Sequence, residues 1–282
     1  MIFFLFMSLL FHPLHSEETY SLAPETKKMY EEGIETYRLE QKWGRLEKLR
    51  VEQLLNQLLP NPPATIADIG GGTGVYAFPL AKKGYALYLI DPVAFHIEEA
   101  KRKVSLQKET PLQEYIIADA RQVPLADNSV DVVLLFGPLY HLNKEDRQIA
   151  LNEAYRILKP NGIILAQTIS KYALMFEVFF DEKINQGKEI SQQIESCLDD
   201  GCFTYNGGSF YAQTPEELRN EVEQAKFQNV RLLAIEGFSR WLPSKEWDNE
   251  YVRKKMLHFI QKTEEDPSIL GISDHIMAVG QK

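Results

Sequence analysis

A series of short, continuous apolar runs separated by helical patterns constrains the fold of this chain more than any other feature. The runs are rich in Ile, Leu and Val, and Gly, Pro or Asp residues bound them: Ala64–Ile69, Ala86–Ile90, Glu114–Ala118, Val130–Phe136 and Gly162–Thr168. Continuous apolar runs of this length are typical of parallel strands buried on both faces. Their alternation with helices predicts an α/β fold with a doubly wound, mostly parallel sheet. Val230–Ile235 and His275–Val279 predict two later strands.

Three stretches of the chain lie outside this alternation. Apolar spacing predicts one helix over Ala23–Leu59, which the stretch Pro60–Pro63 ends. Two insertions, 170–229 and 237–271, follow the fifth and sixth predicted strands. Ligands bind at the carboxyl ends of the strands in open α/β sheets, so we expect residues 23–60 and both insertions to form a lid there. The alternative is that these stretches cover an edge of the sheet.

We expect residues 1–22 to form a hydrophobic, leader-like segment, separate from the domain that residues 23–282 form. Its apolar run, Ile2–Phe11, is too short to span a bilayer. The length suits a signal peptide, but no Lys or Arg precedes the run. A membrane-surface anchor and a start at Met7 or Met29 are alternatives, and we expect no stable membrane insertion.

Charge and cysteine content argue against two classes of protein. The chain has 282 residues and a formal net charge of -9. A protein that binds duplex nucleic acid needs a cationic face to neutralise phosphates, so nucleic-acid binding is not expected. Cys197 and Cys202 have no nearby histidine and do not form a CxxC pair, so the sequence predicts no metal site.

The first predicted strand runs directly into a glycine-rich loop, Gly70-Gly71-Gly72-Thr73-Gly74, and a helical pattern follows. Glycine is needed where a ligand lies against the backbone, because a Cβ would collide with it. Asp68 precedes the loop, and its carboxylate suits the ammonium group of a methionine moiety. We therefore expect a cationic nucleoside bearing an amino acid to bind at Asp68, Gly70, Gly71, Gly72 and Gly74.

Acidic residues also end the second and third predicted strands. Asp91, which Pro92 follows, can accept hydrogen bonds from both hydroxyls of a ribose. Asp119 can accept one from the exocyclic amine of adenine, and the backbone amide of Ala120 can donate to a ring nitrogen. Acids at three successive strand ends are typical of a site for S-adenosylmethionine (SAM). Helix capping is an alternative role for Asp91.

The loop also matches a different fingerprint. The segment from Gly72 to Ala77 fits the G-x-G-x-x-A pattern of dinucleotide-binding proteins. Asp68 would be a poor neighbour for a pyrophosphate, so an NAD-linked oxidoreductase is the less favoured interpretation.

Residues 64–168 resemble class I SAM-dependent methyltransferases of the methyltransferase type 11 kind. Asp131–Phe136 resembles the fourth strand of that family, and Arg156–Gly162 resembles the turn into the fifth. The resemblance implies a Rossmann-like sheet of seven strands, the last antiparallel, and SAM as the cofactor. It implies SAM contacts at the end of the fourth strand as well, from Phe136 and Gly137.

Four shorter segments resemble a bacterial subgroup of these enzymes: Gly44–Glu47, Gly137–Leu142, Pro215–Arg219 and Ser268–Gly271. The subgroup implies no particular acceptor for the methyl group.

The end of the fourth strand is where an acceptor meets the methyl group in this family. Amino-methylating DNA enzymes carry Asn/Asp-Pro-Pro-Tyr there, whereas this chain has Phe136-Gly137-Pro138-Leu139-Tyr140 and no nucleophilic cysteine. Tyr140 and His141 remain as catalytic candidates, with His141 a base for a hydroxyl acceptor. The alternative is that His141 packs at the start of the next helix.

These patterns together predict SAM-dependent methyl transfer to the oxygen or nitrogen, rather than the carbon, of a small molecule. We expect a cytoplasmic location, because the SAM pool is there. A protein that binds SAM without transferring its methyl group is the alternative.

Overall fold

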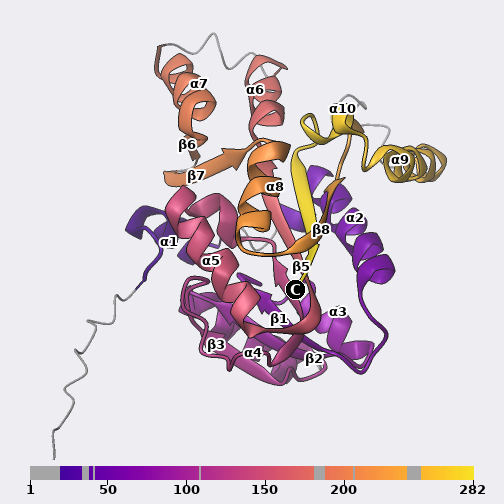
Figure 1. The fold of residues 1–282 in the computed structure, drawn as a ribbon. Coiled ribbons are helices and arrows are strands. Elements are labelled where there is room, and N and C mark those ends of the chain that lie inside the picture. Colours follow the sequence, from indigo (N-terminus) through magenta and orange to yellow (C-terminus); the bar gives the residue numbers. More distant parts are fainter. Residues whose placement is uncertain are drawn as a thin grey trace, which may run out of the picture.

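A computed structural model describes residues 20–33, 38–40, 42–107, 109–180, 188–205, 207–239 and 249–282. The predicted leader segment lies outside these residues up to position 19. Figure 1 shows a central sheet with helices on both of its faces. In chain order the helices are α1 Pro24–Glu31, α2 Lys42–Leu58, α3 Ala77–Lys82, α4 Ala94–Gln107, η2 Pro138–His141 (a 3-10 turn), α5 Lys144–Ile157, α6 Lys171–Phe180, α7 Lys188–Asp200, α8 Pro215–Gln224, α9 Glu250–Thr263 and α10 Pro267–Leu270.

The predicted α/β sheet is confirmed. Its strands are β1 Thr65–Ile69, β2 Ala86–Asp91, β3 Glu114–Ile117, β4 Val130–Leu135, β5 Leu158–Ser170, β6 Cys202–Tyr205, β7 Gly208–Gln213, β8 Gln228–Ala234 and β9 His275–Gln281. The order β3-β2-β1-β4-β5 is parallel throughout, and β9 pairs antiparallel with both β5 and β8. All seven predicted strands are present, and the last is antiparallel as the resemblance implied.

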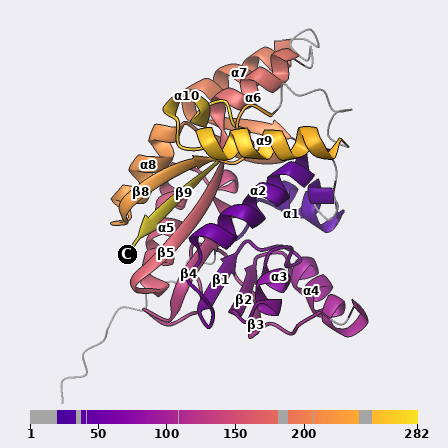
Figure 2. The same ribbon diagram turned by 90° about the vertical axis from the view of Figure 1, so that its right-hand side faces the viewer.

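Side chains alternate between two hydrophobic cores, one on each face of the sheet. In β1, Ala67 and Ile69 face the core covered by α5 and α8, whereas Ile66 faces the core covered by α2, α3 and α4. A strand buried on both faces needs apolar residues at every position, which explains the continuous apolar runs. Figure 2 shows α2 on one side of the sheet and α5 and α8 on the other.

Within the predicted insertion 170–229, residues Cys202–Tyr205 and Gly208–Gln213 form the β6–β7 hairpin. Strand β5 continues past its last pair with β4, Ala166 opposite Leu135, and its end pairs with β7 at Ile169 and Ser170. Because β9 occupies the other edge of β5 up to Ile169, the hairpin extends the sheet beyond the carboxyl end of β4.

The single N-terminal helix predicted over Ala23–Leu59 is two helices, α1 and α2. The chain leaves α1 through Gly33, whose φ of 76° is a left-handed conformation that favours glycine. Helix α1 packs against β7, where Thr26 Oγ1 accepts a hydrogen bond from the Ser209 amide. Helix α2 buries Val51, Leu54 and Leu55 against the sheet, so most of it covers the sheet face rather than the strand ends.

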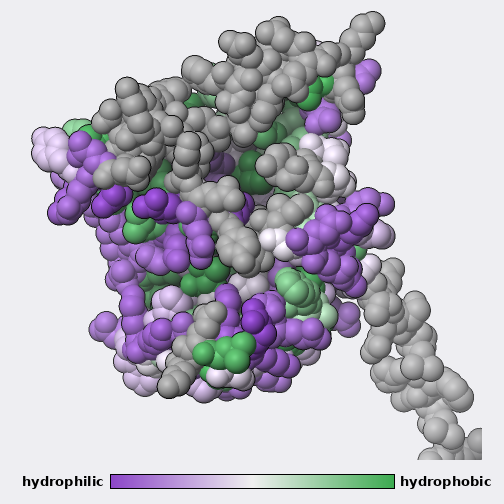
Figure 3. Space-filling model, turned by 180° about the vertical axis from the view of Figure 1, so that it is seen from behind, coloured by the Kyte–Doolittle hydropathy of each residue, from purple (hydrophilic) through white to green (hydrophobic). Residues whose placement is uncertain are grey.

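No helix among the described residues is long and apolar enough to cross a membrane. On the face shown in Figure 3, hydrophilic side chains predominate and apolar ones form smaller groups between them. Within the insertion 170–229, α6 and α7 stand away from the sheet at the top of Figure 1.

Candidate functional site

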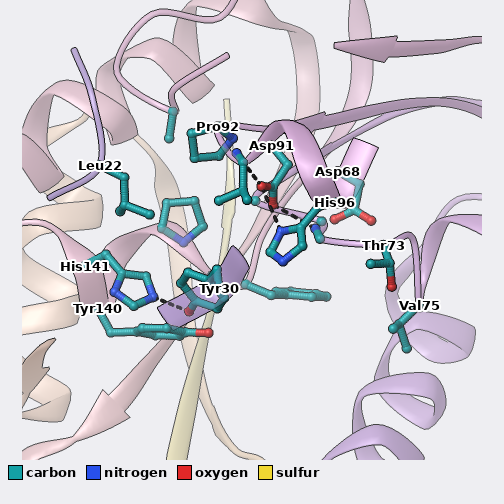
Figure 4. Close-up of a pocket in the computed structure, with 18 of the residues that line it drawn as sticks. Leu22, Tyr30, Asp68, Thr73, Val75, Asp91, Pro92, His96, Tyr140 and His141 are labelled. Atoms are coloured by element: carbon teal, nitrogen blue, oxygen red, sulfur yellow. Dashed lines mark hydrogen bonds and ion pairs between the residues drawn. The ribbon is translucent and has the colours of Figure 1, made fainter. Parts of the chain in front are cut away.

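A cavity at the carboxyl ends of β1, β2 and β4 brings the predicted site residues together (Figure 4). The predicted residues that line it are Asp68, Gly70, Gly71, Gly72, Asp91, Pro92, Asp119, Ala120, Phe136, Gly137, Tyr140 and His141. Gly74 does not line the cavity: its φ is 81°, and a Cβ there would lie 2.8 Å from the Phe78 ring. Packing against Phe78 of α3 and the positive φ therefore explain Gly74 without a ligand.

Only one glycine of the loop faces open space. A Cβ at Gly70 would meet Pro138, and a Cβ at Gly71 would meet the Asp68 carboxylate at 2.6 Å. At Gly72 the φ is 57°, and no atom of the described residues lies within 4 Å of an added Cβ. Gly72 therefore offers its bare backbone to the cavity, as expected for a loop that holds a ligand.

Asp68 is a buried carboxylate that needs a partner from outside the described chain. The residue is 1% exposed, and Oδ2 has no hydrogen-bond partner among the described residues. Burial, together with the charge of Asp91, raises the pKa of Asp68 to about 7. A buried acceptor without a partner costs free energy, which a cationic or hydrogen-bond-donating ligand would recover.

Asp91 is bound by three donors from the protein itself. Its Oδ1 accepts from the Val93 amide at 2.9 Å and lies 3.0 Å from His96 Nδ1, while its Oδ2 accepts from the Gly72 amide at 2.9 Å. The carboxylate thereby fixes both the start of α4 and the glycine loop. These bonds leave less acceptor capacity for two ribose hydroxyls than the sequence suggested, since a carboxylate offers about four acceptor positions.

His96 is a cavity residue that sequence reasoning missed. It lies in the first turn of α4 and is 6% exposed. With Nδ1 held by Asp91, the rest of the imidazole turns toward the cavity (Figure 4). The one sequence signal that could have identified His96 is its spacing of five positions from Asp91, across the turn from β2 into α4.

Asp119 is held by an ion pair at the other side of the cavity. The guanidinium of Arg121 donates to both of its carboxylate oxygens, at 2.8 and 2.9 Å. Arg121 also lies 3.0 Å from Asp146 and stacks over the Tyr20 ring. The N-terminal segment therefore contacts this part of the site.

The phenol of Tyr30 in α1 lies 2.6 Å from Nε2 of His141 at the end of η2 (Figure 4). Burial lowers the pKa of His141 to about 4, although the Ser209 backbone and the charge of Asp91 act in the opposite direction. The imidazole is therefore neutral near pH 7, and in the tautomer with its proton on Nδ1 it accepts a hydrogen bond from the phenol.

Aromatic rings surround this pair. Phe210 of the hairpin lies 4.7 Å from the His141 ring centroid and stacks on Tyr140 at 6.3 Å. Tyr30, Tyr140 and Phe210 are buried together in one small cluster with Met29 and Val93. His141 therefore packs among aromatic rings at the end of η2 and also lines the cavity.

A buried polar network lies at another end of the cavity. The Glu47 carboxylate binds the Arg38 guanidinium and accepts from Gln167 Nε2 at 2.9 Å. A second carboxylate, Glu236, lies 2.7 Å from His275 Nδ1. Arg38 lowers the pKa of Glu47 to about 2 despite burial, and the two carboxylates raise the pKa of His275 to about 9 despite burial. The network therefore holds two anions and two cations.

The chain resembles known methyltransferases. Residues 67–166 match the family described as "Methyltransferase domain". The chain is 27% identical over 129 residues to "Ubiquinone/menaquinone biosynthesis C-methyltransferase UbiE" of Ruegeria sp., covering 45% of this chain and 50% of that protein. It is 35% identical over 117 residues to "O-methyltransferase" of Pyrenophora dematioidea, covering 41% and 43%. The chain thus spans about half the length of the curated relatives it matches.

The fold resembles that of solved structures over most of the chain. One is a SAM-dependent methyltransferase from Thermotoga maritima, titled a possible histamine N-methyltransferase. Its TM-score is 0.55 at 20% sequence identity, and the similarity covers 91% of this chain and 97% of that one.

Proposed function

We propose that the protein is a class I SAM-dependent methyltransferase that transfers a methyl group from SAM to a small-molecule acceptor, because residues 67–166 match the methyltransferase family and the fold resembles that of a solved methyltransferase. One observation carries the proposal: the unpartnered Asp68 carboxylate lies beside the bare backbone of Gly72 in one cavity. An anionic group and an open glycine backbone together suit a cationic ligand that lies against the loop.

We propose that SAM would extend along this cavity. Asp68 is placed for the ammonium group of the methionine moiety, because it is the buried acceptor without a partner. Asp91, with its remaining acceptor capacity, and His96 lie together for the ribose, and Asp119 and Ala120 lie beyond them for adenine. Phe136 and Gly137 also line the cavity, and they would contact SAM at the end of β4. When bound, SAM supplies an electrophilic methyl group.

The acceptor is proposed to bind between the loop and the aromatic cluster. Tyr30 and His141 provide a phenol and a neutral imidazole at that wall, and both line the cavity. A neutral imidazole whose Nε2 accepts from the phenol can take up a proton through Tyr30 from a hydroxyl or amine that acquires a methyl group. This pair supports oxygen or nitrogen as the acceptor atom. The relatives are named as a C-methyltransferase and an O-methyltransferase, so their names do not indicate which atom accepts the methyl group here.

Helix α1 and the β6–β7 hairpin are proposed as the lid over this site. They pack on each other and place Tyr30 and Phe210 above η2. Excluding water there would strengthen the electrostatic contacts within the cavity. We propose a cytoplasmic location, because the reaction needs the SAM pool found there.

The experiment measures binding and transfer separately. Calorimetry with SAM, S-adenosylhomocysteine (SAH) and NAD is expected to show binding of the first two alone. Incubation with methyl-labelled SAM and fractionated metabolites is expected to move label into a small molecule. Binding without any transferred label would favour a SAM-binding protein, and binding of NAD alone would overturn the proposal.

A further inference from the structure

Helix α9 carries a run of positive charge on an acidic chain. From Tyr251 to Thr263 the sequence contains no Asp or Glu and four cations, Arg253, Lys254, Lys255 and Lys262. The whole chain, by contrast, has 40 acidic and 31 basic residues. Salt screens exposed charges beyond about 8–10 Å, so a partner that meets α9 encounters this local positive charge rather than the net charge of the protein.

One side of α9 holds the helix on the domain. Ile260 is fully buried with Leu46 of α2, and Met256 and Leu257 pack on the same small cluster. Figures 1 and 2 show α9 at the outer edge of the molecule, beside α2. Leu46 directly precedes Glu47, which lines the cavity, so α9 is attached next to the segment that forms one wall of the site.

The side of α9 away from Ile260 presents two aromatic rings among lysines. Tyr251 is 69% exposed and Phe259 is 50% exposed. Positions 251, 255, 259 and 262 recur at intervals of three or four residues, so Lys255 and Lys262 share a helix face with the two rings. Lys255 Nζ lies 5.7 Å from the centroid of the Tyr251 ring, as expected for neighbours on one face.

Three acidic residues adjoin α9, and each of them pairs with a cation outside this face. The pairs are Glu250 with Lys254, Glu264 with Arg50 and Glu265 with Arg231. The exposed face therefore combines uncompensated positive charge with apolar rings. Charge complementarity requires an anionic partner, and the rings require an apolar layer beside its anionic groups.

We propose that α9 docks the protein on an anionic lipid bilayer, with Tyr251 and Phe259 in the interfacial layer and Lys255 and Lys262 against the head groups. Aromatic side chains favour the boundary between head groups and hydrocarbon, and lysine side chains extend from that depth to anionic lipids. A duplex nucleic acid would complement the lysines but would offer no apolar layer to the rings. The docking is peripheral, and it places the nearby wall of the cavity at the bilayer surface.

Co-sedimentation of the full chain with lipid vesicles tests the docking. The protein is expected to bind vesicles of phosphatidylcholine and phosphatidylserine, to bind phosphatidylcholine alone much more weakly, and to dissociate as salt is added. Lys255→Gln with Lys262→Gln should weaken binding roughly 25-fold, about fivefold for each lysine removed. Tyr251→Ser with Phe259→Ser should weaken it at least about tenfold, at low and high salt alike.

Lys101→Gln with Lys144→Gln is the matched control, because it removes two exposed lysines from α4 and α5 instead, and vesicle binding should not change. Equal melting temperatures check that all variants fold. No binding to the anionic vesicles, or equal binding by the unaltered protein and the α9 variants, would overturn the proposal. So would binding to a duplex DNA fragment that depends on the lysines while vesicle binding does not depend on the rings.

Discussion

The phenol oxygen of Tyr30 lies 2.6 Å from Nε2 of His141, although 111 positions separate the two residues. One belongs to α1, outside the sheet, and the other ends η2 after β4. The bond therefore joins the proposed lid to the strand end at which methyl transfer is proposed.

Tyr30→Phe should slow methyl transfer while keeping the ring that packs beside His96 and His141. We expect a loss of at least about tenfold under single turnover, because the phenol is lost from the pair. Tyr88→Phe, which removes a hydroxyl bonded to Gln113 outside the cavity, serves as the control. An unchanged rate in Tyr30→Phe, with a slow His141→Ala, would show that His141 acts without Tyr30.

The pH dependence of that rate should lack an acid limb near neutrality. A histidine that must be neutral loses activity as the pH falls through its pKa, which burial lowers to about 4 in His141. Titration of His141 should therefore leave the single-turnover rate of methyl transfer constant from pH 8 to pH 6. His141→Asn, which cannot take up a proton there, distinguishes a base from a positioning group: recovery of the rate relative to His141→Ala indicates positioning. A limb near pH 6.5 that persists in Asp68→Asn would contradict the burial of His141, because the pKa of Asp68 is itself about 7.

Asp68→Asn should stabilise the free protein at pH 8 and weaken SAH binding. The pKa of Asp68 rises from 3.8 to about 7 on folding, so the folded state binds this proton more tightly. Its ionisation therefore lowers the free energy of unfolding increasingly as the pH rises from about 4 to about 7, and the asparagine removes that loss. Urea unfolding at pH 4 and pH 8 measures the free energy of unfolding of both proteins. The variant should be the more stable one only at pH 8. Destabilisation at pH 8 would show that Asp68 is not an uncompensated charge.

Asp91→Ala should weaken SAH binding by roughly 2–4 kcal/mol, the cost of two charge-assisted hydrogen bonds. The variant also frees the Gly72 amide and His96, so part of the loss comes from the loop and the imidazole. His96→Ala separates the contribution of the imidazole from that of the loop, because Asp91 still accepts from the Gly72 amide in this variant. Calorimetry showing full affinity in Asp91→Ala would contradict the site.

Gly72→Ala should fold and lose SAH binding. A Cβ there meets no atom of the described chain, and the φ of 57° costs about 1 kcal/mol for a non-glycine residue. Gly84→Ala is a matched control, since its φ is 95° and its Cβ would contact only Pro62 at 3.7 Å, outside the cavity. Similar melting temperatures, with SAH binding lost only in Gly72→Ala, would support a ligand that lies against the Gly72 backbone. Normal SAH binding in Gly72→Ala would exclude that placement.

The sequence by itself determined the sheet and the glycine-loop wall of the cavity. Continuous apolar runs such as Val130–Phe136 have few alternatives to buried parallel strands, and parallel strands bring their carboxyl ends to one edge. Asp68, Asp91 and Asp119 therefore had to lie close together, as they do. These are consequences of local pattern and of a small set of topologies.

Only the tertiary structure decided what faces that wall. Tyr30, His96 and Arg38 reach the cavity because α1 packs on the β6–β7 hairpin, Asp91 orients the first turn of α4, and Glu47 holds a guanidinium. The lowered pKa of His141 likewise follows from burial by segments distant in sequence. Burial and charge proximity depend on packing between such segments, and no periodicity along the chain encodes them.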